Sequence, residues 1–588
     1  MASSSASIPR PEYPRPQFVR EQWVNLNGPW TFTFDFSKSG MQRGLFTSTG
    51  FDREIIVPFC PESELSGVNH KDFIEQMWYH RPLVIPADWK GQRILLHFGA
   101  VDYESEIFID GKSVLRHYGG SASFTCNLTS FVSPGKTHDL VVYVRDELRA
   151  GNQPSGKQCP DFQSRGCHYT RTTGIWQTVW MEPVNPLGLQ SAYIVPDLDE
   201  SRFIVTPSFY AVKRGCTLRV TLREPGVEKP ISMATAAASN GASIVVPVPH
   251  PRPWSPESPF LYDLELDVLD ENGQVVDSVQ AYAGLRKVHI EGGQVYLNNE
   301  PVYQRLVLDQ GFYPDGIWTA PSDQALHRDI ELSMQAGFNG ARLHQKVFEE
   351  RFHYWADKLG YLTWGESASW GLDMRDTLSA RNFLSEWREI VCRDRSHPSI
   401  ITWTPFNETW ETGDRRQHNR LQIDAYELTR ALDPTRPVND ASGYAHSRTD
   451  LWTVHTYEQD PEKLAELLKP TDGKPWRNFP DREVEYEGQP YLVDEFGGIL
   501  WIPEDRRPFA DNSWGYGSGP RTLDEFYSRL EGQVQALANH EHIVGFCYTQ
   551  LTDVEQEQNG IYNYDRSEKF DMQRIARIFR GETITEKQ

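Results

Sequence analysis

The stretch Ser399–Glu411, "SIITWTPFNETWE", begins as an apolar strand and ends in an amide and an acid. Its first half is rich in β-branched residues, which is typical of a buried strand. Asn407 and Glu408 follow at the carboxyl end, with Trp410 just beyond. Acids are rarely buried unless they are paired or used. The carboxylate at the end of this strand therefore indicates a chemical purpose.

Similar apolar strands alternate with helical patterns from about residue 287 onward. This alternation is typical of helices packed around a parallel sheet. Eight candidate strands over the last half of the chain predict a (β/α)8 barrel, also called a TIM barrel. The candidate strands cover residues 303–310, 340–344, 361–366, 400–408, 437–442, 452–457, 491–496 and 543–553.

The preceding part of the chain is a series of short strand patterns separated by turns. One hairpin turn is expected at Asp110-Gly111. The spacing of the strands predicts a β-sandwich, followed by a smaller one whose size suits an immunoglobulin-like module. We therefore expect three domains, at residues 1–184, 185–286 and 287–588.

Composition limits the partners of the chain. The net charge of −22, from 59 basic and 81 acidic residues, argues against nucleic acid and anionic membranes. Aromatic residues make up 12% of the chain. They suit the flat apolar faces of sugars as well as large β-rich cores. A carbohydrate partner is therefore compatible with the composition.

The amino-terminal segment and the cysteines bear on the compartment. The first residues have no apolar run, so we predict neither a signal peptide nor a membrane span. Seven scattered cysteines favour a reducing compartment, and we expect a cytoplasmic protein. Cys159 and Cys167 are close enough in sequence to pair. No cysteine or histidine cluster has the spacing of a zinc site.

Polar residues gather at the ends of the predicted barrel strands. The active site of such a barrel lies at the carboxyl ends of its strands, so these side chains are expected to meet at one rim. The list is Asp309, Arg342, His344, Glu366, Asn407, Glu408, Asp440, His455, Tyr457, Glu495 and Asp553.

Two carboxylates stand out, Glu408 after the fourth strand and Glu495 after the seventh. They are expected to face each other across the barrel mouth. Paired carboxylates flanking a bond are what glycoside hydrolysis requires. Arg342 would hold one of them ionised by charge pairing. Asp494 is a rival to Glu495, but side chains alternate along a strand, so only one of the two points into the site.

Several segments carry a resemblance to a known family. They are "VNLNGPWTF", "WYHRPLVIP", "TRTTGIWQTVWMEPV", "GFNGARLHQ", "RDRSHPSIITWTPFNE", "DEFGG" and "NGIYNYDR". Over nearly its whole length the chain resembles glycoside hydrolase family 2, the family of β-galactosidases, β-glucuronidases and β-mannosidases. The resemblance implies a sugar-binding jelly roll, an immunoglobulin-like sandwich and a catalytic barrel. It also implies net retention of anomeric configuration.

By matching position, the resemblance makes Glu408 the acid/base, Asn407 a partner of the sugar 2-hydroxyl and Glu495 the nucleophile. A catalytic acid needs a raised pKa, and the neighbouring aromatic residues Trp403, Phe406 and Trp410 lead us to expect one for Glu408. A nucleophile must stay ionised, which the charge of an adjacent arginine favours.

Three departures from the family bear on substrate. Metal-dependent β-galactosidases use a Glu-x-His after the third strand, whereas this chain has Glu366-Ser367-Ala368, so we expect neither metal nor other cofactor. β-Glucuronidases carry an Asn-x-Lys for the sugar carboxylate, and our register places residues 557–559, Glu-Gln-Asn, there. A tryptophan platform after the eighth strand is replaced by Thr549. The last departure favours a different sugar, such as a furanoside or an arabinoside.

Other barrel residues are candidates for substrate contact. Trp370, Trp501 and Trp514 could stack on sugar or pack within loops. The full set of candidate substrate-binding residues is Asn407, Asp309, Arg342, His344, Glu366, His455, Tyr457, Trp410 and Gln550.

The sequence thus predicts an exo-acting retaining glycoside hydrolase that removes a terminal neutral sugar and resembles a β-galactosidase. The open alternatives are β-galactofuranosidase, α-L-arabinosidase, β-mannosidase and β-glucuronidase. An alternative of another class is a non-catalytic carbohydrate-binding protein. The expected partner is an oligosaccharide or glycoside, not nucleic acid or membrane. Dimers and tetramers are common in the resembled family, so a homo-oligomer is left open.

Overall fold

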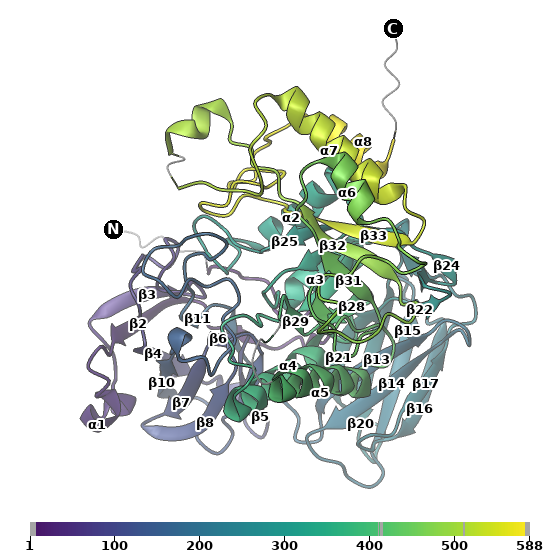
Figure 1. Ribbon diagram of the computed structural model, residues 1–588. Coiled ribbons are helices and arrows are strands. Elements are labelled where there is room, and N and C mark those ends of the chain that lie inside the picture. Colours follow the sequence, from purple (N-terminus) through teal and green to yellow (C-terminus); the bar gives the residue numbers. More distant parts are fainter. Residues whose placement is uncertain (1–7, 410, 412–414, 510–511, 583–588) are drawn as a thin grey trace.

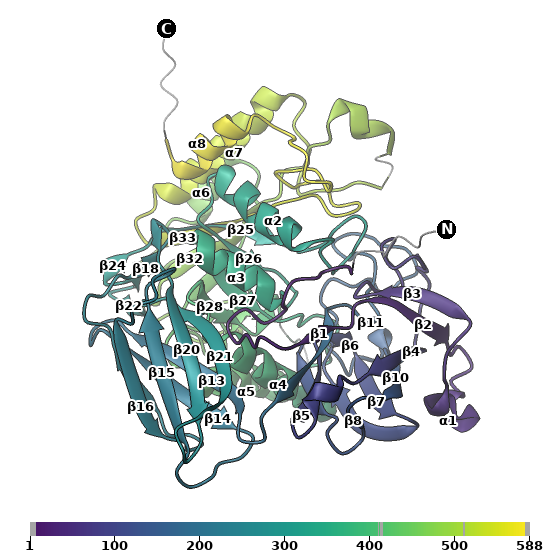
Figure 2. The ribbon, with the colours of Figure 1, turned by 180° about the vertical axis from the view of Figure 1, so that it is seen from behind.

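Two β-sandwiches and a barrel make up the computed structural model (Figure 1). It describes residues 8–409, 411, 415–509 and 512–582. Seen from either side, the sandwiches lie next to each other at the bottom and the barrel rises above them (Figure 2). This is the predicted architecture. Within the described residues, no helix combines the length and the apolar character needed to cross a bilayer.

The amino-terminal sandwich packs two antiparallel sheets, with strand orders β1-β12-β5-β9 and β3-β2-β4-β10-β7-β8. The expected hairpin joins β7 to β8, where Asp110 and Gly111 both have positive φ. That geometry suits a tight turn between twisted strands. The elements are β1 (Val24–Asn25), β2 (Gly28–Phe34), α1 (Gly40–Arg43), η1 (Leu45–Thr47), β3 (Arg53–Val57), β4 (Gln76–Val84), η2 (Ala87–Trp89), β5 (Arg93–Phe98), β6 (Val101–Asp102), β7 (Glu104–Ile109), β8 (Lys112–Tyr118), β9 (Phe124–Asn127), β10 (Thr137–Arg145), η3 (Leu148–Ala150), β11 (Gly174–Ile175) and β12 (Val179–Val184).

The second sandwich has sheets of order β13-β14-β17 and β16-β15-β20-β21. Alternating side chains of its strands, among them Phe203, Val220 and Leu266, are buried between the sheets, as expected when two sheets face each other. The strands are β13 (Leu189–Asp197), β14 (Arg202–Phe209), β15 (Thr217–Arg223), β16 (Ser232–Ala237), β17 (Ile244–Pro247), β18 (Trp254–Ser255), β19 (Ser258–Pro259), β20 (Tyr262–Leu269) and β21 (Val275–Ala283).

The carboxyl-terminal part curls a parallel sheet of order β28-β27-β26-β25-β33-β32-β31. The short parallel pair β29–β30 continues this sheet beyond β28. The elements are β22 (Val288–Glu291), β23 (Gln294–Leu297), β24 (Glu300–Pro301), β25 (Gln304–Asp309), α2 (Asp323–Gln335), β26 (Gly340–Leu343), α3 (Glu350–Leu359), β27 (Leu362–Glu366), α4 (Thr377–Asp394), β28 (Ile400–Thr404), β29 (Phe406–Asn407), α5 (Arg416–Leu432), β30 (Ala441–Ser442), β31 (Trp452–His455), α6 (Pro461–Leu467), β32 (Tyr491–Gly497), η4 (Glu504–Phe509), α7 (Leu523–Ala538), β33 (Ile543–Thr549) and α8 (Met572–Arg580).

The fifth strand is shorter than predicted. Of residues 437–442 only the last two form a named strand, and the segment 443–451 after it contains no helix. Side-chain oxygens replace some of the backbone acceptors of a neighbouring strand. Val438 N donates to Asp450 Oδ2 (2.9 Å), and Gly443 N donates to Thr453 Oγ1 (2.9 Å). These bonds satisfy buried backbone groups without continuous strand pairing.

A loop of the first sandwich is fixed against the barrel mouth. Ser155 N donates to Trp370 O (2.7 Å), and Gly156 N donates to Ala368 O (3.1 Å). Gly156 has a φ of +57°, and a Cβ there would lie 2.3 Å from Gln345 O. Only glycine permits so close an approach in that conformation. The first sandwich therefore contributes side chains to the mouth of the barrel.

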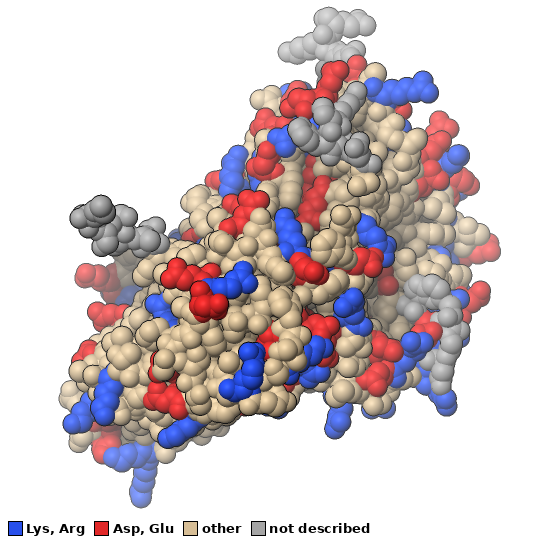
Figure 3. Space-filling view, turned by 90° about the vertical axis from the view of Figure 1, so that its left-hand side faces the viewer, with Lys and Arg blue, Asp and Glu red and all other residues tan. Residues whose placement is uncertain are grey.

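The cysteines and the charged surface complete the description. All seven cysteines are free thiols, including Cys159 and Cys167. On the face drawn in Figure 3, the coloured basic and acidic side chains are interspersed and form no continuous basic area. The expected domain limits at residues 184 and 286 stay predictions.

Candidate active site

Arg342, at the end of β26, lies at the centre of the barrel mouth and is fully buried. Its Nη2 donates to Glu495 Oε1 (2.8 Å) and to Asn407 Oδ1 (2.7 Å). Its Nε donates to Glu366 Oε2 (2.8 Å). Burial alone would lower the pKa of Arg342, but Glu366, Glu495 and Asp494 raise it well above its usual value. One permanent cation thus joins the ends of β27, β29 and β32 to β26.

Glu366 and His344 hold Arg342 from behind. Burial raises the pKa of Glu366 to about 7, against the opposing effects of Arg342 and the backbone N–H of Gln345. His344 Nδ1 lies 2.6 Å from Arg342 Nη2 and 3.2 Å from Glu366 Oε1. Burial and the adjacent guanidinium lower the pKa of His344 well below its usual value. His344 is therefore neutral, and its Nδ1 accepts a hydrogen bond from Nη2 of Arg342.

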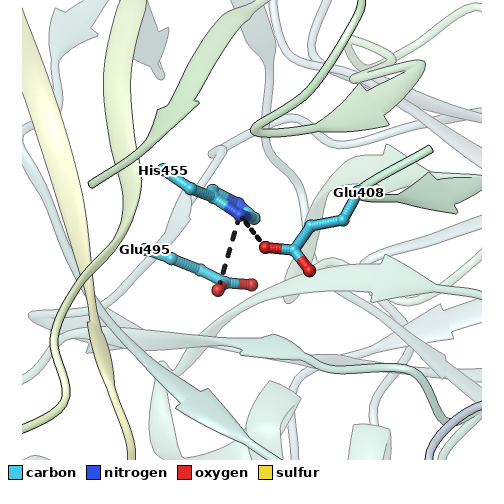
Figure 4. Close-up of side chains that lie close together, drawn as sticks. All are labelled: Glu408, His455 and Glu495. Atoms are coloured by element: carbon cyan, nitrogen blue, oxygen red, sulfur yellow. Dashed lines mark hydrogen bonds and ion pairs between the residues drawn. The ribbon is translucent and has the colours of Figure 1, made fainter. Parts of the chain in front are cut away.

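Glu408 and Glu495 flank the ring of His455 (Figure 4). His455 Nδ1 lies 2.7 Å from Glu408 Oε1 and 3.4 Å from Glu495 Oε2. The nearest oxygens of the two carboxylates and this nitrogen all lie within 4.8 Å of one another. A separation of about 5 Å suits direct attack by one carboxylate, whereas activation of an intervening water needs about 6.5–9.5 Å. The spacing therefore favours nucleophilic displacement.

The far side of His455 rests on Ser442 and Asp494. His455 Nε2 lies 3.0 Å from Ser442 Oγ and 3.2 Å from Asp494 Oδ1, and Ser442 Oγ donates to Asp494 Oδ2 (2.6 Å). Burial lowers the pKa of His455, but Glu495, Asp494 and Glu408 raise it to about 10. The ring is thus an imidazolium at neutral pH. Asp494 lies at Nε2 of the ring, and Glu495 lies at Nδ1.

The expected raised pKa of Glu408 is wrong for the substrate-free protein. Burial does raise it, but the hydrogen bond and charge of His455, then Lys157 and Arg342, lower it below its usual value. The aromatic neighbours do not surround the carboxylate. Trp403 and Phe406 pack toward α4 in the cluster behind the barrel wall. Trp410 lies outside the described residues.

Backbone geometry also sets the position of Glu408. Its φ of +43° is uncommon for a residue with a side chain. Its N–H donates to Ser442 O (3.0 Å). Local strain of this kind gathers at functional sites, where the surroundings impose it. The neighbouring Asn407 has a buried Nδ2 with no partner among the described residues. That amide is a free donor at the barrel mouth.

Tyr457 contacts the second carboxylate. Its hydroxyl donates to Glu495 Oε2 and lies 3.0 Å from Thr549 Oγ1. Its ring stacks on Tyr516, with centroids 3.4 Å apart. Thr549, the last residue of β33, thus places its hydroxyl beside that of Tyr457.

Two predicted substrate-binding residues lie outside this hydrogen-bonded cluster. Asp309 Oδ1 accepts from Gly311 N (2.9 Å), and burial together with Asp329 raises the pKa of Asp309 to about 6. Gln550 Nε2 donates to Asn559 Oδ1 (2.8 Å). Neither has a hydrogen bond to Glu408 or Glu495 in the described part of the chain. Their role in binding substrate stays a prediction.

Other strand-end acids have structural partners. Asp440 accepts from His446 Nδ1 (2.7 Å), and Asp553 pairs with Lys569 Nζ (2.8 Å). These ion pairs are buried and satisfy the acids within the protein. Buried charges need such pairing, so neither acid requires a substrate to account for it.

The aromatic candidates have protein partners. Trp370 Nε1 donates to Asn407 O (3.1 Å), and one face of its ring is covered by Lys157. Trp501 packs against the barrel core. Trp514 Nε1 donates to Gly166 O (2.6 Å), in the loop from the first sandwich. These contacts assign loop packing to all three and leave sugar stacking a prediction.

The first sandwich supplies residues that the sequence did not reveal. Tyr169 donates to Glu557 Oε2 (2.6 Å), and Asn559 Nδ2 donates to its Oε1 (3.0 Å). Burial raises the pKa of Glu557. Lys157 lies nearby with its ammonium 3.9 Å from the centroid of the Trp370 ring. Their irregular loop has no strand or helix periodicity, so no pattern indicated that it reaches the barrel.

The trio of Glu408, His455 and Glu495 also has the spacing of a metal site. A metal would need the imidazole in its neutral form. The raised pKa of His455 keeps a proton on this ring at neutral pH, so the imidazolium itself provides the positive charge. Glu366 is committed to Arg342 and Gln345. The expected absence of a metal stays a prediction.

Three family models match successive parts of the chain. The model described as "Glycosyl hydrolases family 2, sugar binding domain" matches residues 23–154. "Glycosyl hydrolases family 2" matches residues 189–286, and "Glycosyl hydrolases family 2, TIM barrel domain" matches residues 288–498. The barrel model spans Arg342, Glu408, His455 and Glu495.

Relatives and solved structures agree with these models. A β-glucuronidase of Paenibacillus borealis is 24% identical over 469 residues, covering 73% of this chain and 74% of the relative. A β-galactosidase of Thermoanaerobacter pseudethanolicus is 24% identical over 66% of this chain, which spans about half of that relative (51%). The β-glucuronidase of Ruminococcus gnavus in complex with D-glucuronic acid has a TM-score of 0.78 at 18% identity, covering 98% and 100% of the two chains. That likeness shows the fold.

The raised pKa of His455 gives a prediction about stability and pH. A histidine with a folded pKa near 10 stabilises the protein fully below its unfolded pKa, and this contribution is lost as pH rises from about 6.5 to about 10. Each unit of difference between the folded and the unfolded pKa changes the free energy of unfolding by about 1.4 kcal/mol. We expect the thermal midpoint of the wild type to fall between about pH 7 and about pH 9.5 by more than that of His455→Gln.

Differential scanning calorimetry on both proteins at both pH values measures this difference, because other titrating groups are common to the two. Circular dichroism confirms that the variant is folded. Equal pH dependence of the two midpoints would show that His455 is not held as a cation.

Proposed function

Because the chain belongs to glycosyl hydrolase family 2, we propose that it is an exo-acting retaining glycosidase that releases a terminal neutral sugar and resembles a β-galactosidase. Family membership makes the chain a glycosidase acting on carbohydrate. The observation that carries the retaining mechanism is the short separation of the Glu408 and Glu495 oxygens, with Arg342 bound to Glu495.

In the first step Glu495 Oε attacks the anomeric carbon while the bond from that carbon to the glycosidic oxygen breaks. Glu408 gives its proton to the departing oxygen, which leaves as the hydroxyl of the aglycone. The product is a glycosyl ester on Glu495. Arg342 and Tyr457, which donate to the two oxygens of Glu495, orient this carboxylate before attack.

In the second step water attacks the same carbon from the side that the aglycone left. Glu408 takes a proton from this water, and the bond between the sugar and Glu495 breaks. The two inversions give net retention. Protein groups alone balance the proton and the electron pairs in both steps.

The proton for the first step comes from a shared pair. The low pKa of Glu408 places the proton on His455 Nδ1, 2.7 Å from Glu408 Oε1. Transfer along this hydrogen bond gives protonated Glu408 and neutral His455. As Glu495 becomes an ester it loses its negative charge, which weakens its hold on a cationic ring. Glu408 and His455 therefore share one proton, which is transferred to the leaving oxygen when the glycosidic bond breaks.

The charges around the mouth favour a neutral sugar. The cations Arg342, His455 and Lys157 are matched by Glu408, Asp494 and Glu495, and burial raises the pKa of Glu366 and of Glu557. Among the described residues the mouth therefore offers no surplus positive charge to a sugar carboxylate. Because Thr549 stands where the resembled family carries a tryptophan, furanosides and arabinosides belong in the same test.

A glucuronide is the second candidate. It is favoured by the names of the relatives and by the cation Lys157 at the mouth. The buried Glu557 beside that lysine argues against it. A non-catalytic binding protein is disfavoured, because it has no need of two carboxylates held at this spacing.

Hydrolysis of a nitrophenyl glycoside panel by the wild type and by Glu495→Gln tests the proposal. The panel holds β-galactopyranoside, β-galactofuranoside, α-L-arabinoside, β-mannoside and β-glucuronide. We expect a neutral glycoside to be cleaved with retention, seen by NMR of the first product, and its cleavage to fall at least a thousandfold in the variant. Asp263→Ala, on an exposed strand position, is the control. Cleavage of glucuronide alone would overturn the neutral specificity.

Replacement of Glu408 separates its two roles. A leaving group that is already acidic needs little protonation, whereas general acid catalysis is worth about 10²–10⁴-fold for one that is not. We expect Glu408→Gln to slow cleavage of an alkyl glycoside by that factor and to change the first step of a dinitrophenyl glycoside much less. Steady-state and burst kinetics measure both. An equal loss with both leaving groups would contradict the acid role.

A further inference from the structure

We propose that Lys157 of the amino-terminal sandwich is a substrate-binding residue, whose ammonium group donates hydrogen bonds to hydroxyl oxygens of the terminal neutral sugar. This inference rests on the proposed function and adds a residue from outside the barrel to its sugar site. It also identifies the kind of group bound there, a neutral oxygen acceptor and not a carboxylate.

The backbone around Lys157 is fixed to the barrel. On one side, Ser155 and Gly156 donate to the backbone of the loop after β27, and Gly156 lies too close to Gln345 O for any larger residue. On the other side, Tyr169 N donates to Lys157 O (2.7 Å). A side chain held on a rigid backbone loses less entropy when it binds a ligand. The lysine is therefore placed before the substrate arrives.

Lys157 differs from the other buried lysines of the described chain in having no acceptor. Lys346 Nζ donates to Gly311 O and to Trp318 O (2.7 Å), and Lys569 Nζ pairs with Asp553 (2.8 Å). Lys157 is only 5% exposed, yet its ammonium makes no ion pair or hydrogen bond to a described residue. It rests on the face of Trp370 instead. Burying a cation without an acceptor is costly, so its donors are free for a ligand.

The charges of nearby acids act on the ammonium. Burial lowers the pKa of Lys157, but Cys167, Glu557, Glu408 and Glu495 raise it above its usual value. The positive charge of the lysine is thus stabilised by nearby acids that accept no hydrogen bond from its ammonium group. A further anion would be repelled by those acids, whereas a hydroxyl oxygen accepts a hydrogen bond without adding charge. Neutral oxygens are therefore the acceptors that suit this site.

A second donor without a protein acceptor is linked to Lys157 through Trp370. Trp370, on which the ammonium rests, donates its Nε1 to Asn407 O (3.1 Å) and its backbone N–H to Gln345 Oε1 (3.1 Å). The same Asn407 has an unpartnered Nδ2. An ammonium carries three donors. The ammonium and this amide together suit adjacent hydroxyl groups of one sugar ring.

The test measures KM and kcat of Lys157→Met with the neutral glycoside that the wild type cleaves best. Loss of a hydrogen bond to a charged group lowers kcat/KM by about tenfold to a hundredfold. Lys136→Met, an exposed lysine of the same sandwich, is the matched control and is expected to keep the wild-type values. Lys157→Gln is the second variant, and the thermal midpoint of each variant shows that it is folded.

A monodeoxy series of that glycoside identifies the bound hydroxyl. Removal of this hydroxyl is expected to lower kcat/KM in the wild type and to have little further effect in Lys157→Met, since coupled contacts are not additive. Equal losses from every hydroxyl in both proteins would overturn the inference. So would wild-type kinetics of the variant. A loss confined to glucuronide would replace the neutral acceptor by a carboxylate.

Calorimetric titration of the free neutral sugars galactose, arabinose and mannose into Glu495→Gln, with and without Lys157→Met, separates this inference from the proposed function. If the wild type cleaves no glycoside, the function fails, and sugar binding that weakens at least tenfold without the lysine still supports its role. Unchanged binding in the double variant overturns that role independently of catalysis.

Discussion

The buried guanidinium of Arg342 is the interaction on which the rest of the site depends. It binds Glu366, Asn407 and Glu495 at once, and these come from three other barrel strands. A cation without water nearby must be matched by acids, and acids without water nearby must be matched by a cation. The barrel brings both together because the carboxyl ends of its strands meet at one rim. The order of the strands thereby determines where the Glu495 carboxylate lies.

A second cation sets the protonation of the site. His455 lies between Glu408 and Glu495, with Ser442 and Asp494 on its other nitrogen. The acids keep this ring charged, and the ring in turn keeps Glu408 ionised. In the proposed mechanism, acid catalysis is therefore a property of the Glu408–His455 pair. A carboxylic acid in an apolar pocket would hold its own proton, and that is not the arrangement here.

Much of the fold and of the candidate site could be predicted from sequence, because the spacing of apolar residues shows which segments are buried strands and helices. The strands carrying Arg342, Glu408 and Glu495 were found from their apolar runs and polar ends. Two things were hidden. The pKa of Glu408 depends on His455, whose ring nitrogens take their partners from other strands. Lys157 lies in an irregular loop of another domain, and only three-dimensional packing brings that loop to the mouth. The fifth strand was predicted, but it is shorter than its sequence pattern, because side chains of Asp450 and Thr453 replace part of its backbone pairing.

We propose that Glu495 forms a covalent bond to the sugar and that the positive charges of Arg342 and His455 stabilise the acids around it. The fluorine of a 2-deoxy-2-fluoro glycoside of the preferred sugar slows both steps, and a good leaving group restores the rate of the first, so the ester accumulates. Mass spectrometry of the digested protein locates the adduct. The account predicts one added fluorosugar on the peptide containing Glu495, at that residue. An adduct on Asp494 or Glu408, or no adduct together with a product of inverted configuration, would contradict it.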